Sequence, residues 1–201
     1  NEAVEITIGD NSTGIDDNTP TIYGNKVGVD NKGTFNYYDG KIQGKVPIQG
    51  TTTSTPDQYG PVQTGYENGI TTIQLGIVSG YEARIEWVYY TTVQGAVNAT
   101  KTNVSDENRD IVTIIKDIQL KEILEISVAK NMILDLSGYA ITITEKDRVI
   151  NNNGKLEIMD SSIEKIGNIL INSNTGCYGI YNNTGDVTVK EGIISSNVSN
   201  C

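Results

Sequence analysis

Apolar and polar residues alternate in short runs along this chain of 201 residues. In the run Val4-Glu5-Ile6-Thr7-Ile8 successive side chains have opposite character, and turn residues follow it. Period-two alternation closed by Gly, Asp or Asn predicts a short β-strand. From residue 110 onward such runs follow one another closely, at 111–115, 123–126, 132–136, 140–144 and 168–171. The pattern therefore predicts an all-β chain built from many short strands.

One ten-residue pattern, Asn-x-Gly-x-apolar-x-apolar-x-acid-small, occurs three times. Its turn residues are Asn31 and Gly33, Asn152 and Gly154, and Asn183 and Gly185. A turn that precedes a short alternating strand, repeated along a chain, is typical of a solenoid. Leu134 and Leu156 are 22 residues apart, and Val187 follows 31 residues later. Because a coil of three short strands needs about 20 to 30 residues, we predict a parallel β-helix with one coil per copy.

One segment carries a convincing helical signal. Thr91 or Thr92 can act as N-cap, and Val93, Ala96 and Val97 follow at i, i+3 and i+4. We predict one short helix near 92–99. Such a helix can cover the open end of a solenoid, where an apolar core and unpaired backbone groups would otherwise be exposed.

Charge and hydropathy exclude several classes of partner. The formal net charge is −10, and no cluster of Lys or Arg interrupts the dispersed acidic residues. Nucleic acids and anionic membrane surfaces both require a positive patch, so we expect no nucleic-acid partner. No apolar run approaches 18 residues, so we also expect no membrane insertion. The first residues do not form a signal peptide, and the Thr, Asn and Gly-rich composition favours a mature extracellular or wall-exposed segment.

The chain contains no histidine, which excludes imidazole bases for Ser or Cys nucleophiles and the commonest zinc sites. The remaining candidates for catalysis or calcium binding are carboxylates on or beside the repeated strands, namely Asp135, Glu157, Asp160 and Glu191. We interpret them as the solvated face of the strands, since Thr188 and Lys190 occupy equivalent positions. Asp16 and Asp17 lack the spaced ligand series of a calcium loop. We therefore predict no catalytic, cofactor or metal site.

The asparagines and tyrosines allow two interpretations each. Asn151–Asn153 and Asn182–Asn183 could contact sugars, or could bond amide to amide in an internal ladder along a solenoid axis, and we favour the ladder.

Eight of the eleven tyrosines precede position 91. They could form a face on which glycan rings stack, although Tyr is also a common strand residue.

The two cysteines, Cys177 and Cys201, are 24 residues apart, about one coil. This spacing can place them one above the other on adjacent coils, where strands lie about 4.8 Å apart. A disulfide and a stacked pair of free thiols are both compatible with that arrangement.

Several segments together resemble a known family. Residues 92–99, 111–118 and Lys130-Asn131-Met132-Ile133-Leu134-Asp135-Leu136-Ser137-Gly138-Tyr139 are similar to the opening of pectin-lyase-like right-handed parallel β-helix domains in surface proteins of Gram-positive bacteria. Asn-Tyr-Tyr-Asp-Gly at 36–40 resembles the closing coils of such domains. The resemblance implies that residues 1–85 close one β-helix, and that residues 86–201 form the capping helix and opening coils of a second.

The resemblance does not extend to the catalytic patterns of that family. Pectin-degrading members use clustered Asp residues with Arg or Lys, or an Asp trio beside a Gly-His-Gly turn. The second pattern needs a histidine that this chain lacks, and its three arginines, Arg84, Arg109 and Arg148, stand in no matching pattern.

We therefore expect a non-enzymatic extracellular or cell-wall β-solenoid that serves as a structural or adhesive module of a bacterial surface protein. Its expected partner is a glycan or a host or cell-wall surface. Two alternatives remain. One is a carbohydrate-active β-helix enzyme, a polysaccharide lyase or hydrolase. The other is a subunit that associates head to tail into a filament.

Overall fold

The structure is a computed structural model that describes residues 5–9, 15, 20–50, 52, 54–172 and 178–197. The chain divides into two compact units, Asn1–Gly80 and Tyr81–Cys201. In both units almost all regular structure is strand, and the prediction of an all-β chain with one short α-helix is confirmed. Cys177 and Cys201, and also Asp16 and Asp17, lie outside the described residues, so their predicted roles stay predictions.

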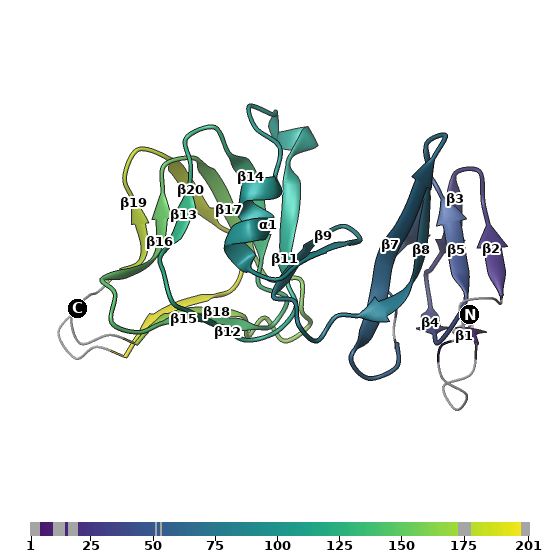
Figure 1. The fold of residues 1–201 in the computed structure, drawn as a ribbon. Helices are drawn as coiled ribbons and strands as arrows, with labels where there is room; N and C mark the ends of the chain where they lie inside the picture. The colour runs from purple at the N-terminus through teal and green to yellow at the C-terminus, as the bar shows by residue number, and fades with distance from the viewer. Residues whose placement is uncertain are drawn as a thin grey trace. The chain divides into compact units, whose positions relative to one another are not determined.

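Six short strands of the first unit pair in parallel, and three separate sheets result (Figure 1). β1 pairs with β4, β2 with β5, and β3 with β6. The chain therefore visits three sheets in turn and then returns to each of them in the same order. Their bounds are β1 (Glu5–Ile8), β2 (Thr21–Tyr23), β3 (Val27–Asp30), β4 (Thr34–Tyr37), β5 (Lys41–Gly44) and β6 (Val46–Gln49).

A long hairpin follows these parallel strands and changes the direction of pairing. β7 (Tyr59–Glu67) and β8 (Ile70–Ile77) are antiparallel to each other, and β8 also pairs antiparallel with β5. Asn68 and Gly69 join the two strands with φ angles of 51° and 77°. Both angles belong to the left-handed region that tight hairpin turns require, as the Asn-Gly pair predicts.

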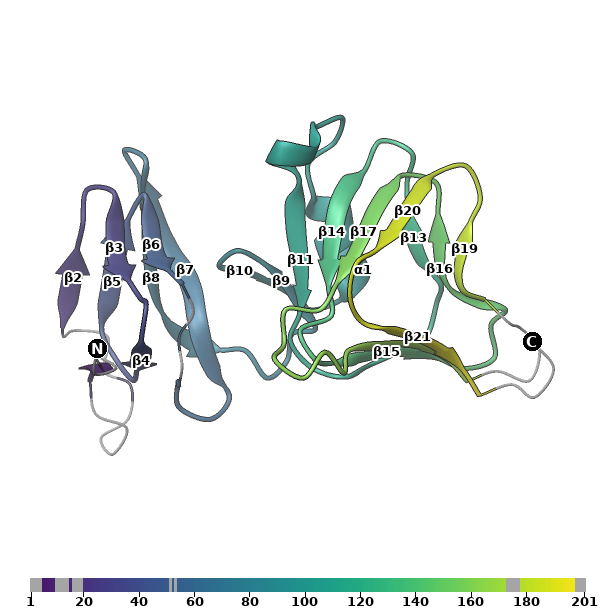
Figure 2. The ribbon, with the colours of Figure 1, turned by 180° about the vertical axis from the view of Figure 1, so that it is seen from behind.

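The second unit contains three sets of parallel strands in three sheets, which the chain also visits in turn (Figure 2). The first sheet contains β11 (Asp110–Ile114), β14 (Asn131–Asp135), β17 (Lys155–Met159) and β20 (Asp186–Val189). The second contains β12 (Ile118–Leu120), β15 (Ala140–Ile143), β18 (Asn168–Ile171) and β21 (Ile193–Ser196). The third contains β13 (Leu124–Ile126), β16 (Arg148–Asn152) and β19 (Tyr178–Asn182). We call each pass through the three sheets a circuit, so that β11 to β13 form the first circuit.

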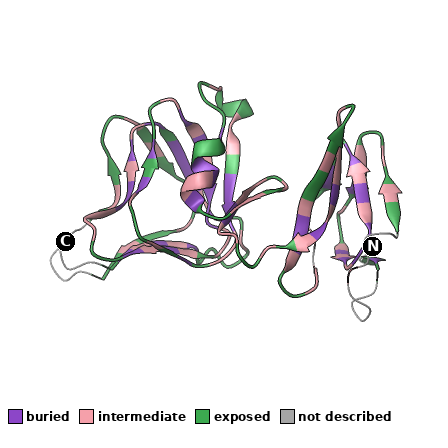
Figure 3. Ribbon diagram, viewed as in Figure 1, coloured by how far each residue is buried: buried purple, intermediate pink, exposed green. Residues whose placement is uncertain are grey.

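Inward side chains of successive circuits lie in register and form apolar columns. Ile118 pairs with Ile141, which in turn pairs with Ile169, and each of the three is at most 2% exposed. Along β15 and β18 buried positions alternate with half-buried ones (Figure 3). Burial of each such side chain contributes about 1.5 to 3 kcal/mol. A one-residue slip would turn each column outward, so the apolar columns fix the register.

A hairpin, an α-helix and a short 3₁₀ helix precede the first circuit of the second unit. The hairpin of β9 (Ala83–Ile85) and β10 (Val88–Tyr90) pairs antiparallel with β11 through β9. Helix α1 (Val93–Ala99) buries Val93, Ala96 and Val97, and the Thr92 side chain accepts a hydrogen bond from the Gly95 N–H. These are the cap and the apolar face that the sequence predicts. A short 3₁₀ helix, η1 (Asp106–Asn108), lies between α1 and β11.

The boundary between the units differs from the one expected. The sequence places it between residues 85 and 86, within an alternating run that reads as one strand. The contacts divide the chain after Gly80, because β9 pairs with β11 of the second unit. Glu86 has a φ of 49° and ends β9, so the run folds back as a hairpin.

Candidate functional site

The Asn-x-Gly turns of the second unit are joined by side-chain amides. Asn152 is fully buried, and its Nδ2 donates to the Gly154 carbonyl at 2.9 Å and to Oδ1 of Asn182 at 2.9 Å. It also lies 3.2 Å from the carbonyl of Asp186. A buried amide needs partners for most of its hydrogen-bonding atoms, and Asn152 finds them within its own turn and the next circuit. This Asn therefore has a structural role.

The turn of the third copy is one residue longer than the sequence pattern suggests. Asn152 pairs in register with Asn182, while Lys155 pairs with Asp186. Asn183 instead donates to Oδ1 of Asn153 at 2.9 Å. The ladder residue of this copy is thus Asn182, and Asn183 forms a second, outer contact between the circuits.

Glycine is required at two of these turns because other backbone atoms occupy the space of a Cβ. At Gly185 a Cβ would lie 2.0 Å from the Gly154 carbonyl oxygen and 2.4 Å from Nδ2 of Asn152. At Gly154 it would lie 2.5 Å from the carbonyl oxygen of Ser127. Both glycines therefore permit close stacking of consecutive turns.

The first unit repeats the local turn. Oδ1 of Asn31 accepts from the Gly33 N–H at 3.0 Å, as Oδ1 of Asn152 accepts from the Gly154 N–H at 3.3 Å. A side chain that accepts from the backbone two residues later is the usual reason for Asn in a turn. The Asn-x-Gly pattern therefore marks the same local conformation in both units.

Two of the candidate carboxylates hold turns together. Oδ1 of Asp135 accepts from the N–H groups of Ser137 and Ser161 at 3.0 and 2.8 Å. Asp160 is fully buried and accepts from the N–H groups of Gly138, Ser162 and Gly167, the last at 2.6 Å. Burial by itself raises the pKa of Asp160, but these hydrogen bonds together outweigh burial and hold its pKa below the usual range. Both carboxylates are thus occupied by backbone donors.

Glu157 on β17 and Glu191, two residues after β20, are both ion-paired. Glu157 lies 2.8 Å from Lys190 and 2.9 Å from Arg109, and its side chain is 10% exposed. The hydrogen bond from Lys190 and the one from Arg109 lower the pKa of Glu157. Glu191 lies 2.8 Å from Lys165. The prediction of a solvated strand face is therefore wrong for Glu157, which is mostly covered by its cationic partners, and for Asp135 and Asp160, which are buried against backbone donors.

The other two arginines also have local partners. The Arg84 guanidinium donates to the carbonyl of Glu86 within the β9–β10 hairpin. Arg148 pairs with the neighbouring Asp147 and lies 4.1 Å from the ring centroid of Tyr181. Neither arginine has a hydrogen bond or an ion pair with Asp135 or Asp160 among the contacts of the described residues.

An open groove of about 540 Å³ lies on the first unit and contains its most prominent aromatic side chains. Tyr23 on β2 is 59% exposed and Tyr66 on β7 is 69% exposed. Between them a row of paired residues crosses the sheet, from Tyr23 to Gln43, from Gln43 to Thr72, and from Thr72 to Gly65. The groove is lined by Tyr23, Gln43, Gly65, Tyr66, Glu67, Asn68, Ile70 and Thr72.

The polar groups of this groove, which we call the Tyr23–Tyr66 groove, are mostly uncharged. Nε2 of Gln43 donates to Oγ1 of Thr72 at 2.9 Å, and this bond fixes the amide on the sheet surface. The Tyr23 hydroxyl donates to Oδ1 of Asn25 at 2.6 Å, which orients its ring. Glu67 is the one charged residue of the lining. Tyrosine rings with amide and hydroxyl groups between them can stack on a sugar ring and hydrogen-bond its hydroxyls.

The sequence indicates part of this groove. The tyrosines before position 91 include Tyr23 and Tyr66, although three of those eight lie in the second unit, and the Asn68-Gly69 turn predicts the hairpin that carries Tyr66. Gln43 and Thr72 give no signal, because they are 29 residues apart and meet only through antiparallel pairing of β5 with β8.

Among the described residues, no group of three or more Asp, Glu or Cys side chains is arranged to hold a metal ion. Every helix within the described ranges is too short or too polar to cross a lipid bilayer.

No protein-family model, curated protein sequence or solved structure matches this chain.

Proposed function

We propose that both units belong to right-handed parallel β-helices of the pectin-lyase-like type, and that the chain is an extracellular module of a bacterial surface protein. The cyclic order of the three parallel sheets supports this proposal, because consecutive parallel strands in separate sheets wind the chain around one core. Crossovers between parallel strands are almost always right-handed. The acidic composition and the Asn ladder are consistent with a rigid, exposed rod.

The module is adhesive and non-enzymatic in this proposal, and its ligand is a carbohydrate bound in the Tyr23–Tyr66 groove. The observation that carries the proposal is the pair of exposed tyrosines on either side of an amide and hydroxyl row. Neutral sugars offer apolar ring faces and hydroxyls, and the groove presents a complement to each. Glu67 stands without a second carboxylate in the lining, whereas glycoside hydrolysis needs two.

The carboxylates of the second unit also favour binding over catalysis. Asp135 and Asp160 accept hydrogen bonds from backbone N–H groups, and Glu157 accepts from two cations. A general acid or base needs a pKa near the working pH. The pKa values of Asp160 and Glu157 are instead lowered, so both are committed to the ionised form.

A glycan array probed with the full chain tests this proposal. We expect binding to neutral oligosaccharides, and a loss of about tenfold or more in Tyr23→Ala and Tyr66→Ala, since each removes a stacking ring. Tyr139→Ala removes an exposed tyrosine of the second unit and is the matched control. Binding that survives both groove substitutions would place the ligand elsewhere. Release of reducing ends or unsaturated products from a polysaccharide by the wild-type chain would favour the enzyme alternative.

A further inference from the structure

In the second unit, the first parallel strand of each of the three sheets has its outer edge covered in a different way or left open. β11, β12 and β13 are the first parallel strands of their sheets. The edge of β11 is covered by the antiparallel strand β9. The edges of β12 and β13 have no strand partner within the described residues. An uncovered strand edge presents N–H and C=O groups that can pair with another chain.

Helix α1 covers the edge of β13 with one side chain. Oε1 of Gln94 accepts from the Glu125 N–H at 2.8 Å, and its Nε2 donates to the Glu125 carbonyl at 3.0 Å. The amide thus makes the two hydrogen bonds that a neighbouring strand would make at this residue. The edge of β13 is therefore satisfied without a strand.

The edge of β12 is left open. The carbonyl of Ile118 accepts from Oγ1 of Thr142 at 3.1 Å, so it faces β15. Backbone groups of successive strand residues point in opposite directions. The N–H and C=O of Gln119 therefore point away from β15, toward the side where the described residues provide no strand.

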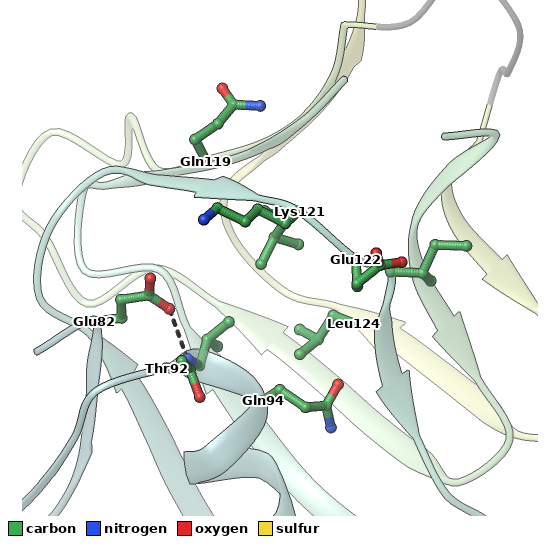
Figure 4. Close-up of a pocket in the computed structure, with 10 residues that line it drawn as sticks. Glu82, Thr92, Gln94, Gln119, Lys121, Glu122 and Leu124 are labelled. Atoms are coloured by element: carbon green, nitrogen blue, oxygen red, sulfur yellow. Dashed lines mark hydrogen bonds between the residues drawn. The ribbon is translucent and has the colours of Figure 1, made fainter. Parts of the chain in front are cut away.

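A cavity of about 330 Å³ lies directly beside this edge (Figure 4). It extends from the first residues of α1 to β12 and the turn that follows, and both Gln119 and Leu120 line it. The other apolar side chains of the lining are Val93, Ile123 and Leu124. Because a cavity of about 150 Å³ holds a benzene molecule, this one can accept one or two apolar side chains.

The charged groups around the cavity leave the strand edge free. Glu82 accepts from the Val93 N–H at 2.9 Å, so its carboxylate already stabilises the start of α1 (Figure 4). Lys121 and Glu122 are exposed at the rim, and Glu122 pairs with Lys146 at 2.7 Å. The Gln119 side chain points away from the cavity (Figure 4), so the backbone beside it stays accessible.

We propose that an extended peptide segment of another polypeptide binds here as an added strand on β12. Its backbone pairs with the outward N–H and C=O of Gln119, and its apolar side chains at alternate positions enter the cavity beside Leu120. A purely apolar small molecule would fill the cavity but leave these backbone groups unpaired. Strand addition satisfies both features at once, since main-chain bonds supply affinity and the cavity selects the side chain.

The natural neighbour of β12 supplies a suitable probe. β15 already pairs with the other edge of β12 and places Ile141 and Ile143 beside Ile118 and Leu120. A fluorescein-labelled peptide with the sequence of residues 138–146 therefore has the required alternation. Its anisotropy is measured as the full chain is added, beside a peptide in which both isoleucines are replaced by Asp. We expect saturable binding of the first peptide and a loss of about tenfold or more with the second.

Proline substitution tests the edge itself. Gln119→Pro removes the outward N–H from an edge strand, a position at which proline is tolerated, and we expect it to weaken binding about tenfold. Ile194→Pro is the matched control on β21, at the opposite edge of the same sheet. The Ile193 N–H donates to Gly167, so the next N–H, that of Ile194, points outward by the same alternation.

The cavity is tested separately with Leu120→Phe, which fills it without altering the strand edge. We expect reduced binding of the isoleucine peptide, with the same far-ultraviolet circular dichroism as the wild-type chain. Three results would overturn the proposal: no binding of the isoleucine peptide at millimolar concentration, equal binding by Gln119→Pro and the wild-type chain, or a loss of binding in Ile194→Pro alone.

Discussion

The side chain of Asn152 donates to Oδ1 of Asn182 over 2.9 Å, although the two residues belong to turns in different circuits. In the circuit before, the residue paired with Asn152 is Ile126, which is fully buried. The ladder of amides therefore begins on top of an apolar column. Asn152 is the first amide of this ladder, and no amide of the circuit before is paired with it. Its other contacts are with the carbonyls of Gly154 in its own turn and of Asp186 in the next circuit.

Replacement of Asn152 by Ala should destabilise the second unit by about 1 to 3 kcal/mol, because buried carbonyl groups and the amide of Asn182 lose their partner. The change is measured as a lower midpoint of urea unfolding. Asn153→Ala removes a partly exposed amide from the same turn and should cost less than about 1 kcal/mol. Equal losses in the two variants would contradict a special role for the buried amide.

Substitution of Gly185 by Ala should be more damaging than its small size suggests. The new Cβ would lie 2.0 Å from the Gly154 carbonyl oxygen, so the backbone of one turn must shift. We expect a loss of about 1 to 3 kcal/mol. At Gly80 a Cβ meets nothing within 4 Å, and Gly80→Ala should be nearly neutral. Thermal unfolding of the two variants under identical conditions makes the comparison, and an unchanged midpoint in Gly185→Ala would show that the turns separate easily.

The sequence predicts the strands whose inward positions are strongly apolar. The runs at 111–115, 132–136, 140–144 and 168–171 coincide closely with β11, β14, β15 and β18. In 140–144 the Ile residues alternate with Thr and leave one possible inward face, whereas 132–136 and 168–171 are nearly continuous apolar runs of strand length. Helix α1 was equally predictable, since a capping Thr precedes an apolar face at helical spacing.

Strands that carry polar residues inward were harder to predict. β16 ends with Asn151 and Asn152, which read as the start of a turn, and β19 ends with Asn182, directly before Asn183. Their strand conformation depends on pairing with circuits above and below, which local sequence does not encode. The same applies to the Tyr23–Tyr66 groove, where Gln43 and Thr72 meet only after β5 and β8 have paired.

Lys130 illustrates a role that is visible only in three dimensions. The residue is 8% exposed, and its ammonium group donates to the carbonyls of Asn98 and Thr100 at 2.8 and 2.6 Å. These carbonyls lie at the C-terminal end of α1, where a positive charge is favourable. The lysine therefore connects the helix to the start of the second circuit.

Substitution of Lys130 by Met should keep the apolar stem of the side chain but leave both carbonyls without the ammonium. We expect a loss of about 1 to 3 kcal/mol and faster amide hydrogen exchange in α1. Lys121→Met removes an exposed lysine of the same unit and should change neither quantity. Protection of the α1 amides that stays at the wild-type level in Lys130→Met would contradict the capping role.

Acid should destabilise the second unit through Asp160 and Glu157. The pKa of each is lowered in the folded state, whereas a carboxyl group in the unfolded chain has a pKa of about 4. The stabilisation is therefore fully present above that pH and is lost as the pH falls through the lower, folded values. Urea unfolding from neutral pH downward should show a falling midpoint in this acid range. Asp160→Asn should reduce the slope, because the protonation linked to Asp160 is removed. Glu164→Gln, which removes an exposed carboxylate from the same turn, is the control, and a slope that changes equally in both variants would contradict the assignment to Asp160.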